Sequence, residues 1–375
     1  PRTLTDPAVL QELEGLEGDE YNKRASEELQ KLWRNKAVVD TYEPGSTFKL
    51  ITCATALETK ASTLEDVYSC TGVKIVGGTP IHCWKTSGHG SQTFLQGMVA
   101  SCNPVLMSVG ERIGRDAFYK SFQAFGFRET TDFELPGEAV GSFFEYNNFN
   151  TVELATTSFG QGFTVTPLQM VSAVSALVNG GVLYRPHIVK KITDSENVTI
   201  EETTPEVIRQ PISKETSDTM RYVMEQVIVQ SGSTAAVEGY RIGGKSGTSE
   251  KQPRGQGNYI ASFVAAAPID DPQIVCLLLL DEPMGDQYYG GQISAPVVAK
   301  IMEETLQYYG IEPQYSPEEE EKMETTVPNV VGKTAQEAEK ALAGFNLSVR
   351  VSGSGQTVSR QDPAEGAHVR EGTTV

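Results

Sequence analysis

A serine and a lysine at the start of an apolar stretch constrain the fold of this sequence most strongly. Ser46 and Lys49 stand three residues apart, and the stretch around and after them is apolar on most sides of a helix: Phe48, Leu50, Ile51, Ala54, Ala56 and Leu57. Such a helix is typical of the centre of a domain. Because residues three apart share one face of a helix, the hydroxyl and the amine are predicted to lie side by side.

The length and charge of the chain limit its class. With 375 residues the chain is longer than one hydrophobic core usually serves, so we expect a large domain and at least one smaller one. Acidic residues outnumber basic ones 49 to 31, which argues against a nucleic-acid partner. The longest apolar run, residues 274–280, is too short to cross a bilayer and predicts a buried strand. Because the sequence starts at Pro1 without a methionine, we expect a fragment.

Periodicity and turn residues predict a mixed fold. Helices are expected at 12–33, from 46 to 57, and at 104–113, 167–178 and 295–309, with Thr166 as the N-cap of the fourth. A glycine-rich loop region is expected between 70 and 92, and strands at 183–192, 239–250, 259–268 and 273–281. Helices and an antiparallel sheet on one core give an α+β fold class.

The C-terminal part of the chain is predicted to form a separate small α/β unit. Residues 313–326 combine Pro, Ser and a run of Glu, which is typical of a solvated linker. Residues 1–312 would then be the first domain, truncated at its N-terminus. Residues 327–375 open with the sequence VPNVVG and continue with an amphipathic helix from Thr334 to Ala343 and short Val-rich strands.

Ser46 and Lys49 are a candidate nucleophile and its base. Serine is inert at its free pKa, whereas a lysine buried beside another cation has a lowered pKa and can take the serine proton. Pro44 and Gly45 would place Ser46 at the helix N-terminus, where free amides and the helix dipole favour an oxyanion. An ordinary helix start fits the same residues, so this motif alone assigns no function.

A second motif, Ser101-Cys102-Asn103, follows 55 residues after Ser46. In an extended turn the side chains of Ser101 and Asn103 would point the same way, one to relay a proton and the other to hold a substrate amide. A helix cap before Pro104 is the simpler interpretation of this tripeptide by itself.

A third motif, Lys245-Ser246-Gly247-Thr248, lies in a predicted strand. Gly247 would let a peptide approach the strand edge and add as a further strand. Lys245 would supply a second positive charge, and the hydroxyls of Ser246 and Thr248 could bind a terminal carboxylate. A basic strand leading into a turn is again the simpler interpretation of the tetrapeptide alone.

Four blocks in this order resemble the class B penicillin-binding proteins. They are YEPGSTFK at 42–49, SCNP at 101–104, GQG at 160–162 with TPLQ at 166–169, and GKSGT at 244–248. Elements of this kind occur together in penicillin-binding proteins and class A β-lactamases. The resemblance implies a penicillin-binding/serine β-lactamase-like transpeptidase domain. Residues 327–375 resemble a PASTA domain, which points to a Gram-positive bacterium, with spore formers as candidates.

The resemblance implies a peptidoglycan D,D-transpeptidase. Ser46 would attack the carbonyl between the two terminal D-alanines of a stem peptide, with Lys49 as its base, and release the last alanine. The backbone amides of Ser46 and Thr248 would form the oxyanion hole. The proton and substrate network would be completed by Ser101, Asn103 and Lys245. An amine of a neighbouring stem peptide would take the acyl group, and β-lactam antibiotics would trap Ser46.

The resemblance also implies a setting for the protein. A membrane anchor and a pedestal domain would precede this fragment, the enzyme would act on the extracytoplasmic face of the cell membrane, and a glycosyltransferase would be its partner. Division and sporulation stay open as roles. The PASTA-like unit would bind muropeptide or serve as a structural docking module.

Glu250 departs from the pattern of the family. Family members often carry a neutral residue such as Gln two places after the motif threonine. A carboxylate opposes an incoming anion, so anionic cephalosporins are expected to acylate the protein slowly. An outward surface glutamate is the other interpretation.

Soft metal ligands gather within 20 residues, namely Cys70, His82, Cys83 and His89. They could make a tetrahedral zinc site, although their spacing matches no standard zinc finger. The resemblance to relatives from anaerobic spore formers, some of which hold zinc beside the active site, implies Cys70, Cys83 and His89, with Asp66 or His82 as the fourth ligand. A Cys70–Cys83 disulfide remains the alternative for a domain outside the cell. No cofactor is required by the predicted reaction.

Two other functions fit the three motifs. A class A β-lactamase shares them but is a smaller single domain and needs a glutamate-activated water. A β-lactam sensor or wall-binding module would use the same elements only for recognition. The C-terminal unit and the GQG block favour the penicillin-binding protein over the β-lactamase, and turnover of a peptide or thioester substrate would exclude a sensor.

Overall fold

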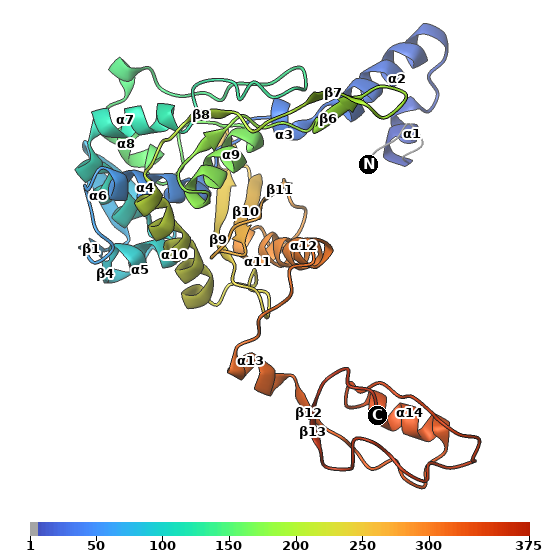
Figure 1. Cartoon of the computed structure of the whole chain (residues 1–375). Coiled ribbons are helices and arrows are strands. Elements are labelled where there is room, and N and C mark those ends of the chain that lie inside the picture. The colour runs from blue at the N-terminus through green and yellow to red at the C-terminus, as the bar shows by residue number, and fades with distance from the viewer. Residues whose placement is uncertain (1–6) are drawn as a thin grey trace. The chain divides into compact units, whose positions relative to one another are not determined.

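The computed structural model describes residues 7–375, which form two compact units (Figure 1). The first unit comprises the chain up to residue 236 together with 241–305, and the second comprises 237–240 and 306–375. Helices and antiparallel strands share the core of the first unit, which confirms the predicted α+β class. Within the described residues, no helix has the length and apolar character needed to cross a membrane.

A three-stranded antiparallel sheet runs through the first unit in the order β11–β10–β9. Its strands are β9 (Gly243–Glu250), β10 (Tyr259–Ala267) and β11 (Ile274–Asp281), close to three of the predicted strands. The central strand β10 is buried almost throughout, whereas β11 is only half-buried, contrary to the prediction of a buried strand. In the described part of the chain, no strand pairs with the outer edge of β9. That edge is therefore open to an added strand.

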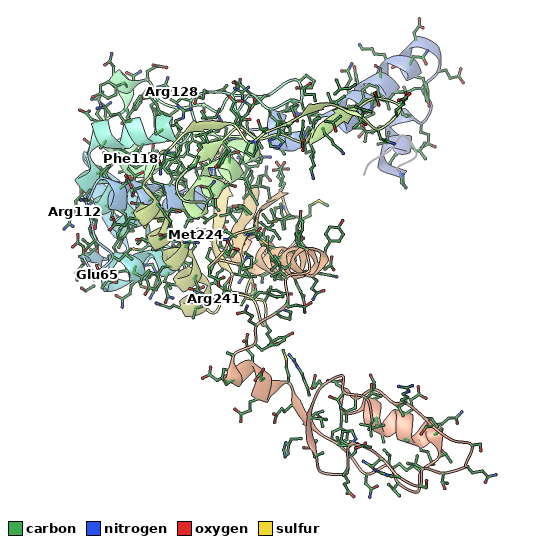
Figure 2. All side chains as sticks on the ribbon, in the orientation of Figure 1. Glu65, Arg112, Phe118, Arg128, Met224 and Arg241 are labelled. Carbon is green, nitrogen blue, oxygen red and sulfur yellow. The ribbon has the colours of Figure 1, made fainter. Side chains whose placement is uncertain are left out.

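The helix α4 (Lys49–Glu58) lies at the centre of the first unit, as its composition predicts. Its residues from Lys49 to Ala56 are buried. Around it pack α6 (Asn103–Ile113), α9 (Pro167–Val178) and α10 (Lys214–Ser231). Met224, labelled in Figure 2, lies on the face of α10 that packs against Gly243 of β9. The remaining helices of this unit are α1 (Pro7–Leu13), α2 (Gly18–Trp33), α3 (Lys36–Val39), α5 (Phe94–Val99), α7 (Arg115–Ala124), α8 (Thr151–Thr157), α11 (Gly290–Ile293) and most of α12 (Ala295–Tyr308).

Some predicted elements are broken or were missed. The helix expected at 12–33 is two helices, because Gly15, which lies between them, and Gly18, the first residue of α2, adopt φ angles of 78° and 60°. The strand expected at 183–192 is β5 (Leu183–Tyr184) and β6 (Lys191–Thr193), separated by a segment with Pro186, which has no backbone donor. Helices α7, α8 and α10 were not predicted. Helix α9 follows the prediction, and the Thr166 hydroxyl caps it by accepting from Gln169 N at 3.1 Å.

Short strands replace the glycine-rich loop predicted between residues 70 and 92. β1 (Val67–Cys70) pairs with β4 (Gly90–Thr93), and β2 (Val73–Val76) pairs with β3 (Thr79–His82). A Cβ on Gly72 would come within 1.9 Å of Thr86 O, so glycine is needed there for a close approach of two backbones. Elsewhere among the described residues of the first unit, β5 pairs with β8 (Val207–Arg209) and β6 pairs with β7 (Thr199–Glu202).

The second unit has a small core of its own. It is formed by Val327, Val330, Ala338, Leu342 and Leu347. Helix α14 (Ala335–Ala343) follows its N-cap Thr334, as predicted, and β12 (Glu324–Thr326) pairs with β13 (His368–Arg370). The segment 313–326, predicted as a linker, contains α13 (Pro317–Lys322) and β12.

Candidate active site

Ser46 lies in a 3₁₀ turn, Gly45–Phe48, that continues directly into α4. Gly45 adopts a φ of 55°, and its N–H donates to Gly160 O at 2.9 Å. A Cβ on Gly160 would come within 1.9 Å of the Gly45 carbonyl oxygen, so this close contact requires glycine. The turn at 160–162 thus supports the turn that carries Ser46, which stays partly exposed to solvent.

Lys49 is fully buried and points at the second motif. Residues three apart eclipse each other in a 3₁₀ turn, which keeps Lys49 on the same face as Ser46. Its Nζ donates to Ser101 O at 2.6 Å, to Asn103 Oδ1 at 2.7 Å and to Ser101 Oγ at 3.1 Å. Burial, and then the nearby charge of Lys245, hold the pKa of Lys49 well below its ordinary value.

Ser101 and Asn103 meet at Lys49, but not through the extended turn that was predicted. Ser101 adopts a left-handed φ of 51°, and Asn103 is the first residue of α6. This turn directs both the carbonyl and the hydroxyl of Ser101 to Lys49. The Asn103 side chain also donates from Nδ2 to His82 O at 3.3 Å. The left-handed conformation, costly for a serine, is what brings the two side chains to one amine.

Lys245 is the second buried cation of the site, with 1% of its surface exposed. Burial lowers its pKa to about 8, and Nζ donates to Ser246 O at 3.1 Å. A Cβ on Gly247 would come within 2.5 Å of Ser262 Oγ and 3.0 Å of Pro44 O. Gly247 therefore lets β9 approach β10 and the turn before Ser46, in addition to leaving the strand edge open.

Ser246, Thr248 and Glu250 alternate with the buried residues of β9 and are half-buried. Thr248 Oγ1 accepts from Gly290 N at 3.1 Å, which ties β9 to α11. The carboxylate of Glu250 accepts from Gly255 N at 2.5 Å, in the loop between β9 and β10. Glu250 therefore supports this loop at the end of the strand that carries Thr248.

A polar network beside Ser46 was not predicted. The carboxylate of Glu43 accepts from Gly162 N at 3.3 Å and from Arg254 Nη2 at 3.1 Å, while Glu43 O accepts from Ser249 Oγ at 2.8 Å. Arg254 also donates to Gln161 Oε1 at 3.2 Å. The network joins the segment before Ser46 to the turn at 160–162 and to the β9–β10 loop.

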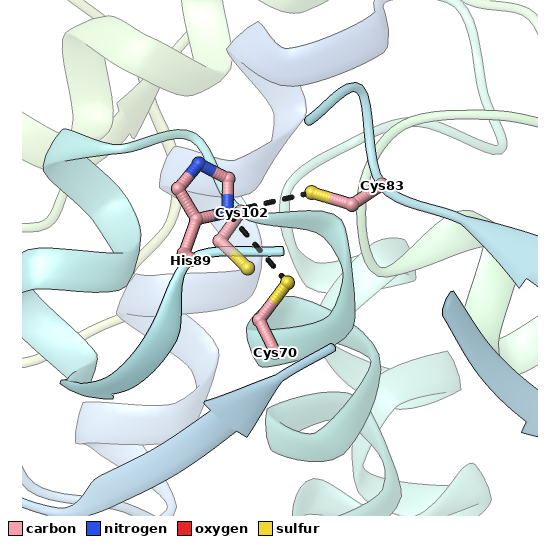
Figure 3. A group of neighbouring side chains, drawn as sticks. All are labelled: Cys70, Cys83, His89 and Cys102. Carbon is pink, nitrogen blue, oxygen red and sulfur yellow. Dashed lines mark hydrogen bonds between the residues drawn. The ribbon is translucent and has the colours of Figure 1, made fainter. Parts of the chain in front are cut away.

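Four potential metal ligands converge beside the second motif (Figure 3). The ligand atoms of Cys70, Cys83, His89 and Cys102 all lie within 4.8 Å of one another. His89 Nδ1 is 3.6 Å from the sulfur of Cys70 and also 3.6 Å from that of Cys83. A hydrogen bond from the Cys102 thiol, backbone N–H groups and His89 lower the pKa of Cys83 to about 4. All four side chains are at least partly buried, and each cysteine is a free thiol.

The fourth member of this cluster differs from the prediction. Asp66 accepts from Ser62 Oγ at 3.0 Å and from Arg112 Nη1 at 2.6 Å, so its carboxylate is already engaged elsewhere. The side chain of His82 is exposed. Cys102 takes the place expected for them. In the sequence, Cys102 lies between Ser101 and Asn103 and was therefore interpreted only as part of the second motif. The pairing of β1 with β4 and of β2 with β3 brings Cys70, Cys83 and His89 to Cys102.

Two family models match this chain. Residues 11–303 match the family described as penicillin binding protein transpeptidase domain, and residues 325–375 match the PASTA domain.

Curated relatives match over most of this chain. The chain is 42% identical over 353 residues to the stage V sporulation protein D of Bacillus subtilis, covering 91% of this chain and 54% of that protein. It is 32% identical over 286 residues to the peptidoglycan D,D-transpeptidase FtsI of Escherichia coli, covering 75% of this chain and 46% of that protein. The chain thus spans about half the length of these relatives.

Solved structures show the same fold. The transpeptidase domain of penicillin-binding protein 3 from Burkholderia pseudomallei aligns with a TM-score of 0.67 at 31% identity, over 76% of this chain and 84% of that one. Penicillin-binding protein 3 of Mycobacterium tuberculosis aligns with a TM-score of 0.69 at 27% identity, over 76% and 66%.

Proposed function

Because the chain belongs to the penicillin-binding protein transpeptidase family, we propose that it is a peptidoglycan D,D-transpeptidase acting through an acyl-enzyme at Ser46. The observation that carries this proposal is the environment of Lys49. Its amine is buried beside Lys245 and bonded to Ser101 and Asn103, so one side chain links all three motifs. An amine with a lowered pKa is the base that a serine nucleophile needs.

Acylation begins with a proton transfer from Ser46 to neutral Lys49. Ser46 Oγ then forms a bond to the carbonyl carbon between the two terminal D-alanines, and the backbone amides of Ser46 and Thr248 stabilise the oxyanion. The carbon–nitrogen bond breaks as the nitrogen of the last alanine receives a proton from Lys49 through the Ser101 hydroxyl. D-Alanine leaves, and the remaining peptide is an ester of Ser46.

The second half of the reaction transfers the acyl group to an amine. The amine of a neighbouring stem peptide forms a new amide bond to the ester carbon, and the bond from that carbon to Ser46 Oγ breaks. The proton released by the amine returns to Ser46 through Lys49. Lys245, with Ser246 and Thr248, holds the terminal carboxylate of the donor during acylation and that of a β-lactam in inhibition.

Turnover of a thioester with an acceptor tests this function. We expect the chain, given diacetyl-L-lysyl-D-alanyl-D-thiolactate and glycine as acceptor amine, to form the peptide amide with glycine, and the Ser46→Ala variant to form none. Hydrolysis alone, with no amide, would point to a β-lactamase or carboxypeptidase. No turnover at all by a protein that binds penicillin would point to a sensor.

The setting of the reaction belongs to the same proposal. The similarity to a sporulation protein over 91% of the chain favours a role in making the spore wall. The enzyme would act on the extracytoplasmic side of the membrane with a separate glycosyltransferase. Expression of the whole protein in a sporulating host that lacks its own relative would test this, and failure to restore the spore wall would leave the division role.

Zinc held by Cys70, Cys83, His89 and Cys102 is a second part of the proposal. In a tetrahedral site with Zn–S of about 2.3 Å and Zn–N of about 2.0 Å, neighbouring sulfur and nitrogen ligands lie about 3.5 Å apart. Both distances from His89 Nδ1, each 3.6 Å, are close to this value. The low pKa of Cys83 supplies the thiolate that zinc prefers. Bound zinc would act as a structural cross-link that fixes Cys102, and with it the turn between Ser101 and Asn103.

Metal content separates this site from a disulfide. We expect about one zinc ion per chain in the parent, and less in Cys102→Ser, by elemental analysis of the purified protein. Cys276→Ser is the matched control, since Cys276 is a half-buried cysteine on β11 outside the cluster. A metal-free parent whose intact mass shows a Cys70–Cys83 or Cys83–Cys102 disulfide would contradict the zinc site.

A further inference from the structure

Trp84 is a large aromatic side chain that is held in place yet remains exposed. The side chain has 63% of its surface in solvent. Its indole Nε1 donates to Ala100 O at 3.1 Å, and its ring meets the ring of His89 at 5.4 Å between centroids with a 62° tilt. Two contacts at fixed geometry settle the orientation of the ring. An ordered tryptophan with an open surface is typical of a binding contact.

The position of Trp84 is tied to the second catalytic motif. Ala100, which accepts the indole N–H, directly precedes Ser101. His82, two residues before Trp84, accepts from the side chain of Asn103. The segment from His82 to Trp84 therefore runs along the turn that holds Ser101 and Asn103. Two residues of extended chain span about 6.6 Å, so Trp84 lies within a side chain's length of the Asn103 side chain, which would hold the substrate amide.

We propose that the exposed surface of Trp84 contacts the long aliphatic side chain of the residue that precedes the two terminal D-alanines of the donor peptide. This inference rests on the proposed function and on two expectations from the sequence, that the donor adds along β9 and that Asn103 holds its amide. The residue before that amide then passes the indole ring. Methylene groups pack on the ring surface, and a terminal ammonium gains a cation–π contact at an exposed site.

A pair of peptide thioesters tests the contact. The two donors end in D-alanyl-D-thiolactate and carry either diacetyl-lysine or acetyl-glycine before it, and the quantity measured is the ratio of their acylation rate constants. We expect the parent to prefer the lysine compound by about tenfold, the value of a well-packed side chain in an open site. We expect Trp84→Ala to bring this ratio close to one and Trp84→Phe, which keeps a ring, to retain part of it.

The ratio also separates the contact from a purely structural role. Loss of folding or of the Cys/His cluster slows both donors equally and leaves the ratio unchanged, so an unchanged ratio in Trp84→Ala would overturn the proposal and leave Trp84 as a cover for His89. A parent that fluorescent penicillin does not acylate would instead contradict the proposed function itself.

Intrinsic fluorescence tests the same contact in a protein that keeps Trp84. The sequence has two tryptophans, and Trp33 lies on α2, so Trp33→Phe leaves Trp84 as the single reporter. In the Trp33→Phe, Ser46→Ala protein, we expect diacetyl-lysyl-D-alanyl-D-alanine to lower the acrylamide quenching of Trp84 and acetyl-glycyl-D-alanyl-D-alanine to leave it unchanged. Equal quenching with both peptides at saturation would contradict the contact.

Discussion

Lys49 and Lys245 are both almost inaccessible to solvent, and their protonation states are set by that burial more than by any partner. Burial disfavours the charged form of an amine, and the charge of Lys245 lowers the pKa of Lys49 further. The two lysines thus take different roles. The lowered pKa of Lys49 favours the neutral form, which the proposed role as a base needs, while Lys245, with a pKa of about 8, is mostly charged at neutral pH, as the proposed role in holding an anion needs.

The pH dependence of acylation follows from the lowered pKa values of these two lysines. The rate constant for acylation by penicillin should rise with pH as Lys49 loses its proton, because only the neutral amine is a base. It should fall again near pH 8, because Lys245 then loses the charge that holds the carboxylate. Stopped-flow acylation between pH 5 and pH 10 measures the profile. The apparent pKa values belong to the coupled pair of lysines.

Lys245→Arg is the control for the falling limb, since arginine keeps its charge throughout this range. If this variant is acylated, its rate constant should not fall between pH 8 and pH 10. A parent rate constant that stays level to pH 10 would contradict the role given to Lys245.

Glu250 lies two residues after Thr248, at the end of the strand that holds the ligand carboxylate. Replacement by Gln keeps the acceptor for Gly255 N and removes one negative charge. Two residues of extended chain span about 6.6 Å, and one charge at about that distance in a partly wet site is worth about 1 kcal/mol, so Glu250→Gln should react about fivefold faster with an anionic cephalosporin. A zwitterionic cephalosporin should gain less. If the variant reacts no faster with the anionic drug, the Glu250 carboxylate does not oppose the ligand and only supports the loop at Gly255.

At the scale of elements, the site is held together by close contacts between turns and strands. The turn at 160–162 supports the turn before α4, and Gly247 lets β9 pack beside Ser262 and Pro44. The N–H of Gly290 donates to the hydroxyl of Thr248. Each contact joins segments far apart in the sequence. The geometry of Ser46 therefore depends on backbone contacts that tolerate no added side chain.

Gly160→Ala tests this dependence. Its Cβ would meet Gly45 O at 1.9 Å, and its φ of 91° is unfavourable for alanine. Backbone strain and overpacking together should cost about 2–5 kcal/mol in unfolding free energy, and displacement of Gly45 should slow acylation at least about tenfold. Chemical denaturation and penicillin acylation measure the two effects.

Gly180→Ala is the matched control for this change. Gly180 has a similar φ of 95°, and an added Cβ would meet no atom within 4 Å. Gly180→Ala should lose unfolding free energy through backbone strain alone, and its rate of acylation by penicillin should stay close to that of the parent. If both variants acylate equally well, the contact between Gly160 and Gly45 does not position Ser46.

At the scale of the whole molecule, the sequence predicts those features that depend only on residues close together in the sequence. The Ser46–Lys49 spacing, the Thr166 cap and the apolar strands are local features, and the structure contains them. The contact of Lys49 with Ser101 and Asn103 depends on packing between α4 and α6, which no local pattern encodes. Cys102 was missed as a cluster member for the same reason, because nested hairpins bring Cys70, Cys83 and His89 to it.

The most direct measurement is the intact mass of the protein after incubation with fluorescent penicillin, for the parent and for Ser46→Ala. An enzyme that forms a stable acyl-enzyme at Ser46 should gain the mass of one penicillin in the parent, keep it through a denaturing gel, and show no adduct in Ser46→Ala. An adduct on the Ser46→Ala variant, or rapid consumption of penicillin with no adduct on the parent, would contradict Ser46 as the transpeptidase nucleophile.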